Sequence, residues 1–249
     1  MRNLSGRTAL VTGAARRIGR QISLSLADSG CDVVLHYSRS ESEALELKSE
    51  IERKGQRAWT VGQTFDAIDS ADTLMASVKE KAGSVDILVN SASVFPSKLE
   101  VSPAVADFEP LLSVNALIPW RLSILFSMQT ASGDIVNMLD SRISGHDIGR
   151  PVYYLSKQML RHVTEQTALS LAPSIKVNAV APGLALPPHG RGIDYFEKLK
   201  DEVPLKTYGS PGDVVDAVLF LIRSSFITGQ IIYVDGGQHL TARTYGTVH

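Results

Sequence analysis

Short apolar segments alternate with longer segments that carry one apolar face along most of this chain. Seven short runs predict strands, at Thr8–Thr12, Val33–Tyr37, Ala58–Val61, Asp86–Asn90, Gly133–Met138, Lys176–Ala181 and Ile231–Val234. Longer stretches with helical spacing predict helices between them, at Ile18–Asp28, Glu41–Lys54, Ser70–Ala82, Phe108–Thr130, Tyr153–Leu171 and Asp213–Ser224. Strands that are apolar on both faces and alternate with helices indicate a parallel sheet covered on both sides. The pattern therefore predicts a doubly wound α/β fold.

No internal repeat, low-complexity tract or linker divides the 249 residues, so we expect one domain over 1–249. Pro119 is a possible kink in the long fourth helix. A substrate loop is expected near 184–210, after the sixth strand. Its most Gly- and Pro-rich part, Pro187–Gly192, suits a lid and suits a plain surface loop equally well.

The composition is that of an ordinary soluble protein, with 44% hydrophobic and 20% charged residues and a net charge of −1. This balance argues against nucleic-acid and membrane-surface partners. No signal-peptide pattern and no apolar run of membrane-spanning length are seen, so we expect the cytoplasm. The single cysteine, Cys31, lies in an apolar run and is interpreted as a small buried hydrophobe. No Cys/His cluster has zinc-ligand spacing, and no metal is expected.

A glycine-rich turn, Thr12–Gly19, joins the first strand to the first helix. Gly13 permits backbone angles that other residues avoid, and Gly19 allows the helix to pack closely on the strand. The N–H groups at the start of a helix favour a phosphate. Because this turn opens the first β-α-β unit, it predicts a dinucleotide site rather than a tight turn alone.

The end of the second strand indicates which dinucleotide is bound. Folds that prefer NAD tend to place an acidic residue there to bind the ribose hydroxyls, whereas this chain has the run 36–40, His-Tyr-Ser-Arg-Ser. Arg16, Arg17 and Arg39 are placed to surround a 2′-phosphate, and Ser40 to donate a hydrogen bond to it. The segment favours NADPH; the alternative is that these arginines form a solvated rim.

Tyr153 and Lys157 are four residues apart and share one face of a predicted helix, whereas the neighbouring Tyr154 does not share that face. A nearby ammonium lowers the pKa of a tyrosine, ordinarily about 10. Tyr153 is then able to exchange a proton with a substrate oxygen or a relay partner.

With these motifs in order, the chain resembles the short-chain dehydrogenase/reductase family over nearly its whole length. The matching segments are Thr12–Gly19, Asn90–Ser93, Asn115, Tyr153 with Lys157, Asn178, Pro182–Gly183 and Asp235–Gly237. The resemblance implies a seven-stranded Rossmann sheet, a nicotinamide cofactor and a homotetramer. It implies that Asn115 helps to carry a water that links Lys157 to solvent. The cofactor contacts that it and the preceding motifs suggest are Gly13, Arg16, Arg17, Ile18, Gly19, His36, Tyr37, Arg39, Ser40, Asp66 (for the adenine amine), Asn90, Ser91, Ala92, Tyr153, Lys157, Pro182 and Gly183.

One position departs from the family's pattern. Most members have a serine thirteen residues before the tyrosine, and here that position is Asp140; Ser141 replaces it only if the register slips by one. A carboxylate only accepts hydrogen bonds, so it is a poor partner for a ketone and suits a substrate protonated on a ring nitrogen. A cap for the following loop is the alternative role for Asp140.

Asp140 is similar to the pteridine reductase branch of the family, as are Arg17, the 36–40 segment and the Ser93-Val94-Phe95 run. The resemblance implies a pterin stacked between the nicotinamide and Phe95, with Asp140, Tyr153 and Lys157 relaying a proton. The substrate contacts implied are Arg17, Ser93, Phe95, Asp140, Tyr153 and Leu184. A core-packing role is the alternative for Phe95, and a structural role is the alternative for Asn115; for Asn178 we favour a structural role.

We therefore predict an NADPH-dependent reductase of a dihydropterin, dihydrofolate or dihydromonapterin. The alternatives are a carbonyl or 3-oxoacyl thioester reductase of the same family and a non-catalytic NADP-binding sensor. Asn115, Tyr153 and Lys157 together argue against the sensor.

Overall fold

The structure is a computed structural model, and it describes residues 1–96, 105–187, 190–241 and 244–245. Seven strands form one parallel sheet in the order β3-β2-β1-β4-β5-β7-β8. Their bounds are β1 Thr8–Val11, β2 Asp32–Tyr37, β3 Ala58–Gly62, β4 Ile87–Asn90, β5 Gly133–Met138, β7 Ile175–Pro182 and β8 Ile231–Val234. The predicted doubly wound, seven-stranded Rossmann sheet is confirmed.

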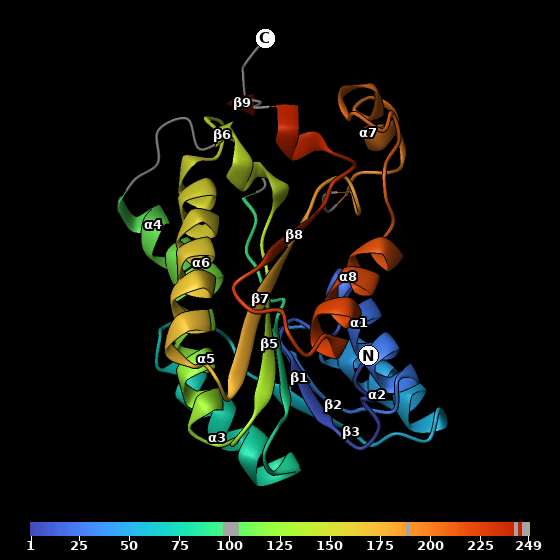
Figure 1. Cartoon of the computed structure of the whole chain (residues 1–249), viewed down its shortest axis with the longest axis vertical. Helices are drawn as coiled ribbons and strands as arrows, with labels where there is room; N and C mark the ends of the chain where they lie inside the picture. The colour runs from blue at the N-terminus through green and yellow to red at the C-terminus, as the bar shows by residue number, and fades with distance from the viewer. Residues whose placement is uncertain (97–104, 188–189, 242–243, 246–249) are drawn as a thin grey trace.

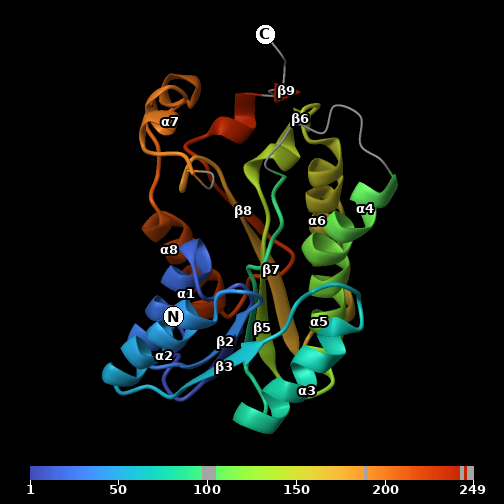
Figure 2. The ribbon, with the colours of Figure 1, turned by 180° about the vertical axis from the view of Figure 1, so that it is seen from behind.

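Helices cover both faces of the sheet, as Figure 1 shows with the sheet seen almost edge-on. One layer holds α1 (Arg17–Asp28), α2 (Glu41–Arg53) and α8 (Pro211–Arg223). The other holds α3 (Ser70–Ala82), α5 (Ile118–Ser127) and α6 (Pro151–Ser170), with α4 (Val105–Leu112) beside α6. Figure 2 shows the same two layers from behind. All four residues of β1 and of β4 are buried between the layers, which is why these strands are apolar on both faces.

Two helices begin two residues earlier than the periodicity predicts, because a proline occupies their first turn. Pro211 opens α8, and Ser210 and Asp213 form a capping box around it. Pro151 opens α6, where the Asp147 carboxylate accepts hydrogen bonds from the N–H groups of Gly149 and Arg150. The spacing of apolar residues carries no information about these polar caps, so it could not predict where the two helices begin.

The long helix expected at Phe108–Thr130 is confirmed in outline, because helical structure continues without a gap from Val105 to Ser127. It consists of α4, a π-helical turn at Ser113–Leu117 and α5, and Pro119 stands in the first turn of α5 rather than at a kink. By length and composition the run Phe108–Ser127 is apolar enough to cross a membrane, contrary to the expectation that no run is. Its buried side chains, Ile118, Leu122 and Phe126 among them, pack into the core beneath α3.

The expected substrate loop contains more regular structure than its composition suggests. It includes α7 (Asp194–Glu197) and a 3₁₀ turn at Lys200–Glu202, and Phe196 of α7 is buried. Pro188 and His189 of the possible lid lie outside the described residues. A short second sheet, not predicted, pairs β6 (His146–Asp147) with β9 (Thr244–Tyr245).

Asn178 and Cys31 both have structural roles. Asn178 of β7 donates to the carbonyl of Ile227 and accepts from the N–H of Gln230, so the structural role favoured for it is confirmed. Cys31 is buried, and burial raises the pKa of its thiol to about 11, as expected for a small inert hydrophobe.

A buried carboxylate forms several ion pairs at the edge of the sheet where the strands begin. Asp134, at the start of β5, is nearly inaccessible and forms ion pairs with Arg2 (2.6 Å), Arg7 (2.8 Å) and Lys176 (2.6 Å). Burial lowers the pKa of Lys176, although Asp134 opposes this effect. One carboxylate therefore joins the N-terminal segment, β5 and β7.

Candidate active site

The glycine turn after β1 is held by close backbone contacts. Gly13 has a φ of +64°, and a Cβ there would lie 3.0 Å from the Cα of Ala92. A Cβ on Gly19 would lie 2.2 Å from the carbonyl oxygen of Gly13. The first turn of α1 has neither a side-chain cap nor an acidic residue, so its N–H groups are open to an anion.

Thr12 fixes this turn against the end of β4, a role that sequence reasoning missed. Its hydroxyl accepts from the N–H groups of Ser91 and Ala92, both at 3.0 Å, and the residue is buried. The signal that the sequence offered for this role was a threonine directly before the first glycine of the turn. The structure thus brings Gly13, Ser91 and Ala92 together, as predicted.

His36 is placed beneath the glycine turn rather than beside it. Its Nδ1 accepts from the N–H of Gly13 at 3.1 Å, and its Nε2 donates to the carbonyl of Gln63 at 2.9 Å. Burial lowers the pKa of His36 to about 4, against the effect of the Gln63 hydrogen bond, so the ring is neutral. His36 also stacks on Phe65, with ring centroids 4.4 Å apart. The ring therefore positions the glycine turn, and a contact of His36 with a dinucleotide stays a prediction.

The three arginines near the turn differ in their surroundings. Arg16 is paired with Glu43 of α2, and Arg17, with a φ of +56°, donates to the carbonyl of Pro187 at 2.6 Å. Arg39 is exposed just beyond β2, next to Ser40. Among these three, the Arg39 guanidinium is therefore the one for which no partner is seen in the described part of the chain.

Other predicted dinucleotide contacts lie around the same edge. Tyr37 donates to Glu41 at 3.0 Å, which directs its hydroxyl to α2, and Asp66 is exposed after β3. Gly183, after β7, approaches Asp235 so closely that a Cβ would lie 2.6 Å from the Asp235 Cβ. Leu184 lies at one side of a pocket of about 650 Å³ between β8 and the substrate loop, apart from Tyr153.

Tyr153 and Asp140 face each other at the carboxyl end of β5. The Tyr153 hydroxyl donates to Oδ2 of Asp140 at 2.9 Å, and Oδ1 of Asp140 accepts from the N–H of Arg142. Asp140 is thus both the cap of the 3₁₀ turn Ser141–Ser144 and the partner of Tyr153. Asp140, and not its neighbour Ser141, is therefore the residue that the structure shows bonded to the Tyr153 hydroxyl.

The pKa of Tyr153 is shifted in the direction opposite to the one that the sequence led us to expect. Burial, followed by the Asp140 carboxylate, raises the pKa of Tyr153 well above its usual value. Lys157 lies 5.8 Å from the centre of the Tyr153 ring and donates to the carbonyl of Met138 at 2.9 Å. Burial lowers the pKa of Lys157 to about 8, although Asp140 opposes this effect. The idea that Lys157 sets a low pKa for Tyr153 is therefore wrong in this structure, in which Tyr153 is a neutral phenol.

Asn115 lies in the π-helical turn and holds the loop after β4. Its side chain accepts from the Ser93 hydroxyl (3.0 Å) and the Val94 N–H (2.8 Å), and donates to the Val94 carbonyl and the Ser156 hydroxyl (3.0 Å each). These four bonds use the whole amide. The structure therefore shows Asn115 positioning Ser93 and Val94, and the expected water link to Lys157 stays a prediction.

Phe95 packs against Tyr153 and is not a core residue. The residue is 38% exposed, and its ring meets the Tyr153 ring edge-on, with centroids 4.8 Å apart. The guanidinium groups of Arg150 and Arg142 lie 4.7 and 5.4 Å from the Phe95 centroid. The core-packing alternative is wrong, and an exposed aromatic ring stands directly beside the Tyr153–Asp140 pair.

Asn90 is the start of a buried polar chain behind this pair. Its amide donates to Asn137 at 2.8 Å, and Asn137 donates to Thr164 at 2.9 Å. Within the described ranges the buried Oδ1 of Asn90 has no hydrogen-bond partner. Asn90 therefore joins β4, β5 and α6 beneath the site.

The assembled edge combines an open helix N-terminus, a buried Tyr–Asp pair, a buried lysine and an exposed aromatic ring. In the described ranges, no group of three or more His, Cys, Asp or Glu side chains is arranged to hold a metal ion. The geometry supports proton transfer by Tyr153 next to a bound anionic cofactor.

Comparisons with known proteins agree with this arrangement. A family model described as enoyl-(acyl carrier protein) reductase matches residues 13–239. The 3-oxoacyl-[acyl-carrier-protein] reductase FabG of Staphylococcus epidermidis is 30% identical over 94% of this chain and 99% of its own length. Pteridine reductase 1 of Leishmania tarentolae is 34% identical over 94% and 96%.

A solved structure is also similar over its whole length. The crystal structure of FolM alternative dihydrofolate reductase 1 from Brucella canis, complexed with NADP, has a TM-score of 0.89 and 30% identity, with all of both chains covered. The glycine turn, the Tyr153/Lys157 pair and these matches lead to one conclusion: the chain belongs to the short-chain dehydrogenase/reductase family of oxidoreductases.

Proposed function

We propose that this protein reduces the ring of a pterin, namely a dihydropterin, dihydrofolate or dihydromonapterin, with NADPH. The observation that carries the proposal is the 2.9 Å hydrogen bond from the Tyr153 hydroxyl to the Asp140 carboxylate. A carboxylate at this position accepts hydrogen bonds and does not donate to a ketone oxygen. A nitrogen heterocycle offers the N–H groups that such a site binds.

The residues present fit a dinucleotide phosphate. The uncapped N-terminus of α1 and the glycine turn would hold the pyrophosphate. Arg39 and Ser40, at the acid-free end of β2, would hold a 2′-phosphate. When bound, the cofactor supplies the hydride. The NADP complex of the Brucella canis relative supports this assignment.

Replacing the exposed arginine tests the choice of cofactor. We expect Arg39→Ala to weaken NADPH binding about 10- to 100-fold, because a charge-assisted hydrogen bond contributes about 1.5–3 kcal/mol. Binding of NADH, which lacks the 2′-phosphate, is expected to change less than about threefold. Fluorescence titration with both nucleotides measures the two constants.

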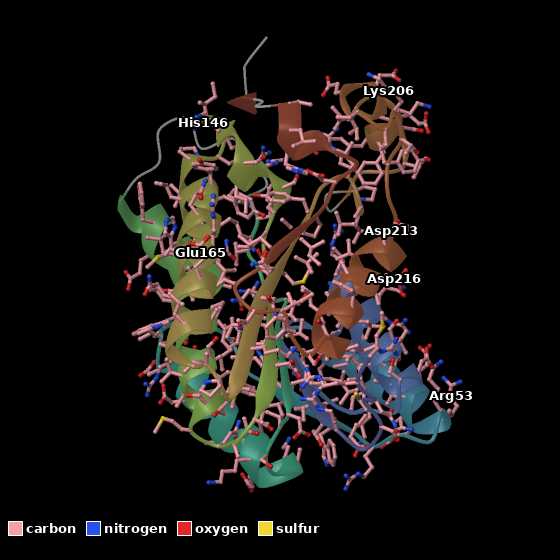
Figure 3. All side chains as sticks on the ribbon, viewed as in Figure 1. Arg53, His146, Glu165, Lys206, Asp213 and Asp216 are labelled. Carbon is pink, nitrogen blue, oxygen red and sulfur yellow. The ribbon has the colours of Figure 1, made fainter. Side chains whose placement is uncertain are left out.

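Arg53 provides the control for that experiment. It is also exposed, at the distant end of α2, where Figure 3 labels it. Arg53→Ala removes the same charge from the protein and is expected to leave both affinities unchanged. Equal losses of NADPH and NADH affinity in Arg39→Ala would contradict the proposed phosphate contact.

The substrate is proposed to lie on the exposed ring of Phe95, beside the neutral phenol of Tyr153. Tyr153 would donate its hydroxyl proton to the substrate and regain one from solvent before the next turnover, Asp140 orients its hydroxyl, and Lys157 lies buried behind the pair. Arg17, Ser93 and Leu184 are proposed as further contacts at the rim. Binding must accommodate the two guanidinium groups that now flank Phe95.

A substrate panel tests the proposal. We expect NADPH oxidation with 7,8-dihydropterins and quinonoid dihydropterins, and little with simple ketones or 3-oxoacyl thioesters. We expect Asp140→Ser to lower kcat/KM for the pterin at least about 100-fold, because it removes the carboxylate from the relay. Thioester turnover by the wild type, improved by Asp140→Ser and without detectable pterin turnover, would contradict the proposal.

Reduction of 3-oxoacyl thioesters is the second candidate. It is favoured by the FabG relatives, which match 94% of the chain at about 30% identity. Protein that binds NADPH but turns over nothing in the panel would instead support a non-catalytic sensor.

We also propose a homotetramer in the cytoplasm. Large apolar side chains are exposed on neighbouring helices, with Trp120 on α5 at 43% and Leu155 and Leu169 on α6 at 48% and 76%. The proposal is that these side chains contribute to one apolar patch, since large exposed apolar patches mark contacts between proteins.

A further inference from the structure

Arg150 lies directly before α6, three residues ahead of Tyr153. Its backbone N–H donates to the Asp147 carboxylate at 3.0 Å, and its carbonyl accepts from the N–H of Tyr154 at 2.9 Å. These two bonds fix the backbone of Arg150 against the first turn of α6. The point from which the Arg150 side chain emerges is therefore fixed relative to Tyr153.

The Arg150 guanidinium lies beside the exposed ring on which the substrate is proposed to lie. It is 4.7 Å from the Phe95 centroid, and the Tyr153 ring is 4.8 Å from the same centroid. The contact with Phe95 is a cation–π attraction, which leaves the positive charge of the guanidinium uncompensated. A substrate that reaches Tyr153 across Phe95 therefore passes close to this charge.

The neighbouring cations differ from Arg150 in their partners. Arg142 donates to the Asp147 carboxylate at 2.7 Å and lies 3.9 Å from the Asp140 carboxylate, so two anions balance its charge. Lys157 is buried and donates to a backbone carbonyl behind the Tyr153 ring. Neither of these cations is as free as Arg150 to bind an incoming anion.

The partners of the Arg150 side chain carry no negative charge. Its Nε donates to the Pro96 carbonyl at 3.3 Å, and Phe95 supplies the aromatic contact. Within the described ranges, no carboxylate lies at ion-pair distance from this guanidinium, and no hydrogen bond from its two terminal nitrogens is seen. A guanidinium offers a planar fork of N–H donors that matches a carboxylate or a phosphate.

The surroundings of Arg150 strengthen its attraction for an anion. The residue is half-buried, so solvent and salt screen its charge less than they screen a fully exposed arginine. A hydrogen bond from a charged donor to an anion is also about twice as strong as a neutral one.

We propose that Arg150 is a specificity-determining residue, which selects substrates that carry a carboxylate or a phosphate on the substituent extending across Phe95. This inference rests on the proposed place of the substrate on Phe95, but not on the identity of the reacting group. Arg150 lies outside the segments on which the family resemblance rests.

Three matched pairs of ligands, each with and without the anionic group, test the inference. Dihydrofolate and its glutamate diamide test the carboxylate, and dihydroneopterin phosphate and dihydroneopterin test the phosphate. Acetoacetyl-phosphopantetheine and acetoacetyl-pantetheine test a phosphate on a thioester. Calorimetry measures the affinity of each ligand for the NADP⁺-loaded protein, in which no hydride is available, and kcat and KM are measured with NADPH.

We expect the wild-type protein to bind the charged member of at least one pair about 10- to 100-fold more tightly, because only that member forms a charge-assisted hydrogen bond with Arg150. For a pair that is reduced, the preference should lie in KM rather than in kcat, since the anionic group is remote from the reacting atoms. It should shrink at 1 M salt, where the screening length is only about 3 Å.

Three variants assign the preference to this side chain. Arg150→Met keeps an unbranched chain beside Phe95 and is expected to bring the ratio of the two affinities to about one. Arg150→Glu is expected to reverse the preference, and an acidic residue suits the start of a helix, so the fold is retained. Arg161→Met removes the same charge from α6, where Arg161 pairs with Glu165 (labelled in Figure 3), and is expected to leave the ratio unchanged.

A wild-type ratio near one for all three pairs overturns the inference, and so does a ratio that Arg150→Met leaves unchanged or a failure of all six ligands to bind. Pterins that are reduced without this preference would overturn the role of Arg150 and leave the proposed function standing. An Arg150-dependent preference for the charged thioester, without turnover of any pterin, would instead overturn the proposed substrate and support the role of Arg150.

Discussion

Tyr153→Phe is expected to lower kcat at least about 1,000-fold with little change in NADPH affinity. Proton transfer by a positioned side chain contributes about 10²–10⁴ in rate, and Tyr153 is a neutral phenol whose ring contacts Phe95, the residue on which we propose that the substrate lies. Phenylalanine retains the ring that packs on Phe95 but removes the hydroxyl bound to Asp140. Stopped-flow NADPH oxidation under single-turnover conditions measures the loss, and nucleotide titration measures the affinity.

Tyr154 gives a matched control one residue away. Its hydroxyl accepts from Nε2 of Gln158 at 2.7 Å and takes no part in the pair. Tyr154→Phe makes the same chemical change and should retain wild-type kcat within about twofold. Retention of more than a tenth of the activity by Tyr153→Phe would show that another group supplies the proton.

Asp134→Ala is expected to reduce the free energy of unfolding by about 3–5 kcal/mol, since it leaves Arg2, Arg7 and Lys176 without their shared anion. For a chain of this size the loss corresponds to a fall in Tm of about 6–20 °C. Lys176 contributes most to the cost, because it lies deepest and burial already lowers its pKa. Calorimetry and urea unfolding measure the two quantities.

Asp72→Ala serves as the comparison, because it removes a carboxylate that binds Arg121 at the surface. Exposed pairs contribute about 0–1 kcal/mol, so its Tm should fall by only a few degrees. Equal losses in the two variants would mean that the Asp134 cluster is no more than a surface contact.

The strands were predictable because each is a local apolar run, and all seven form the main sheet. The starts of α6 and α8 were not, because they depend on proline and on polar caps from Asp147 and Ser210. The π-helical turn between α4 and α5 also had no counterpart in the apolar spacing. It places Asn115, whose amide then holds the loop at Ser93 and Val94.

The candidate site also contains residues that the sequence predicted and residues whose roles only the structure revealed. Spacing on one helix paired Tyr153 with Lys157, and a departure from the family's serine singled out Asp140. Spacing assigned His36 to the dinucleotide, yet its ring lies under the glycine turn. Thr12 was missed because the N–H groups that bind its hydroxyl, those of Ser91 and Ala92, come near it only in the fold.

By itself the sequence determined the sheet, the glycine turn and the Tyr153/Lys157 pair, since these follow from short-range periodicity and from residue types at fixed spacing. Only the tertiary structure decided the charge state of the site. Burial and the Asp140 carboxylate raise the pKa of Tyr153 where the sequence had led us to expect that Lys157 would lower it. A pKa depends on burial and on distances through space, and Asp147, Arg142, Asp140 and Tyr153 reach those distances only when β5, β6 and α6 meet at one edge of the sheet.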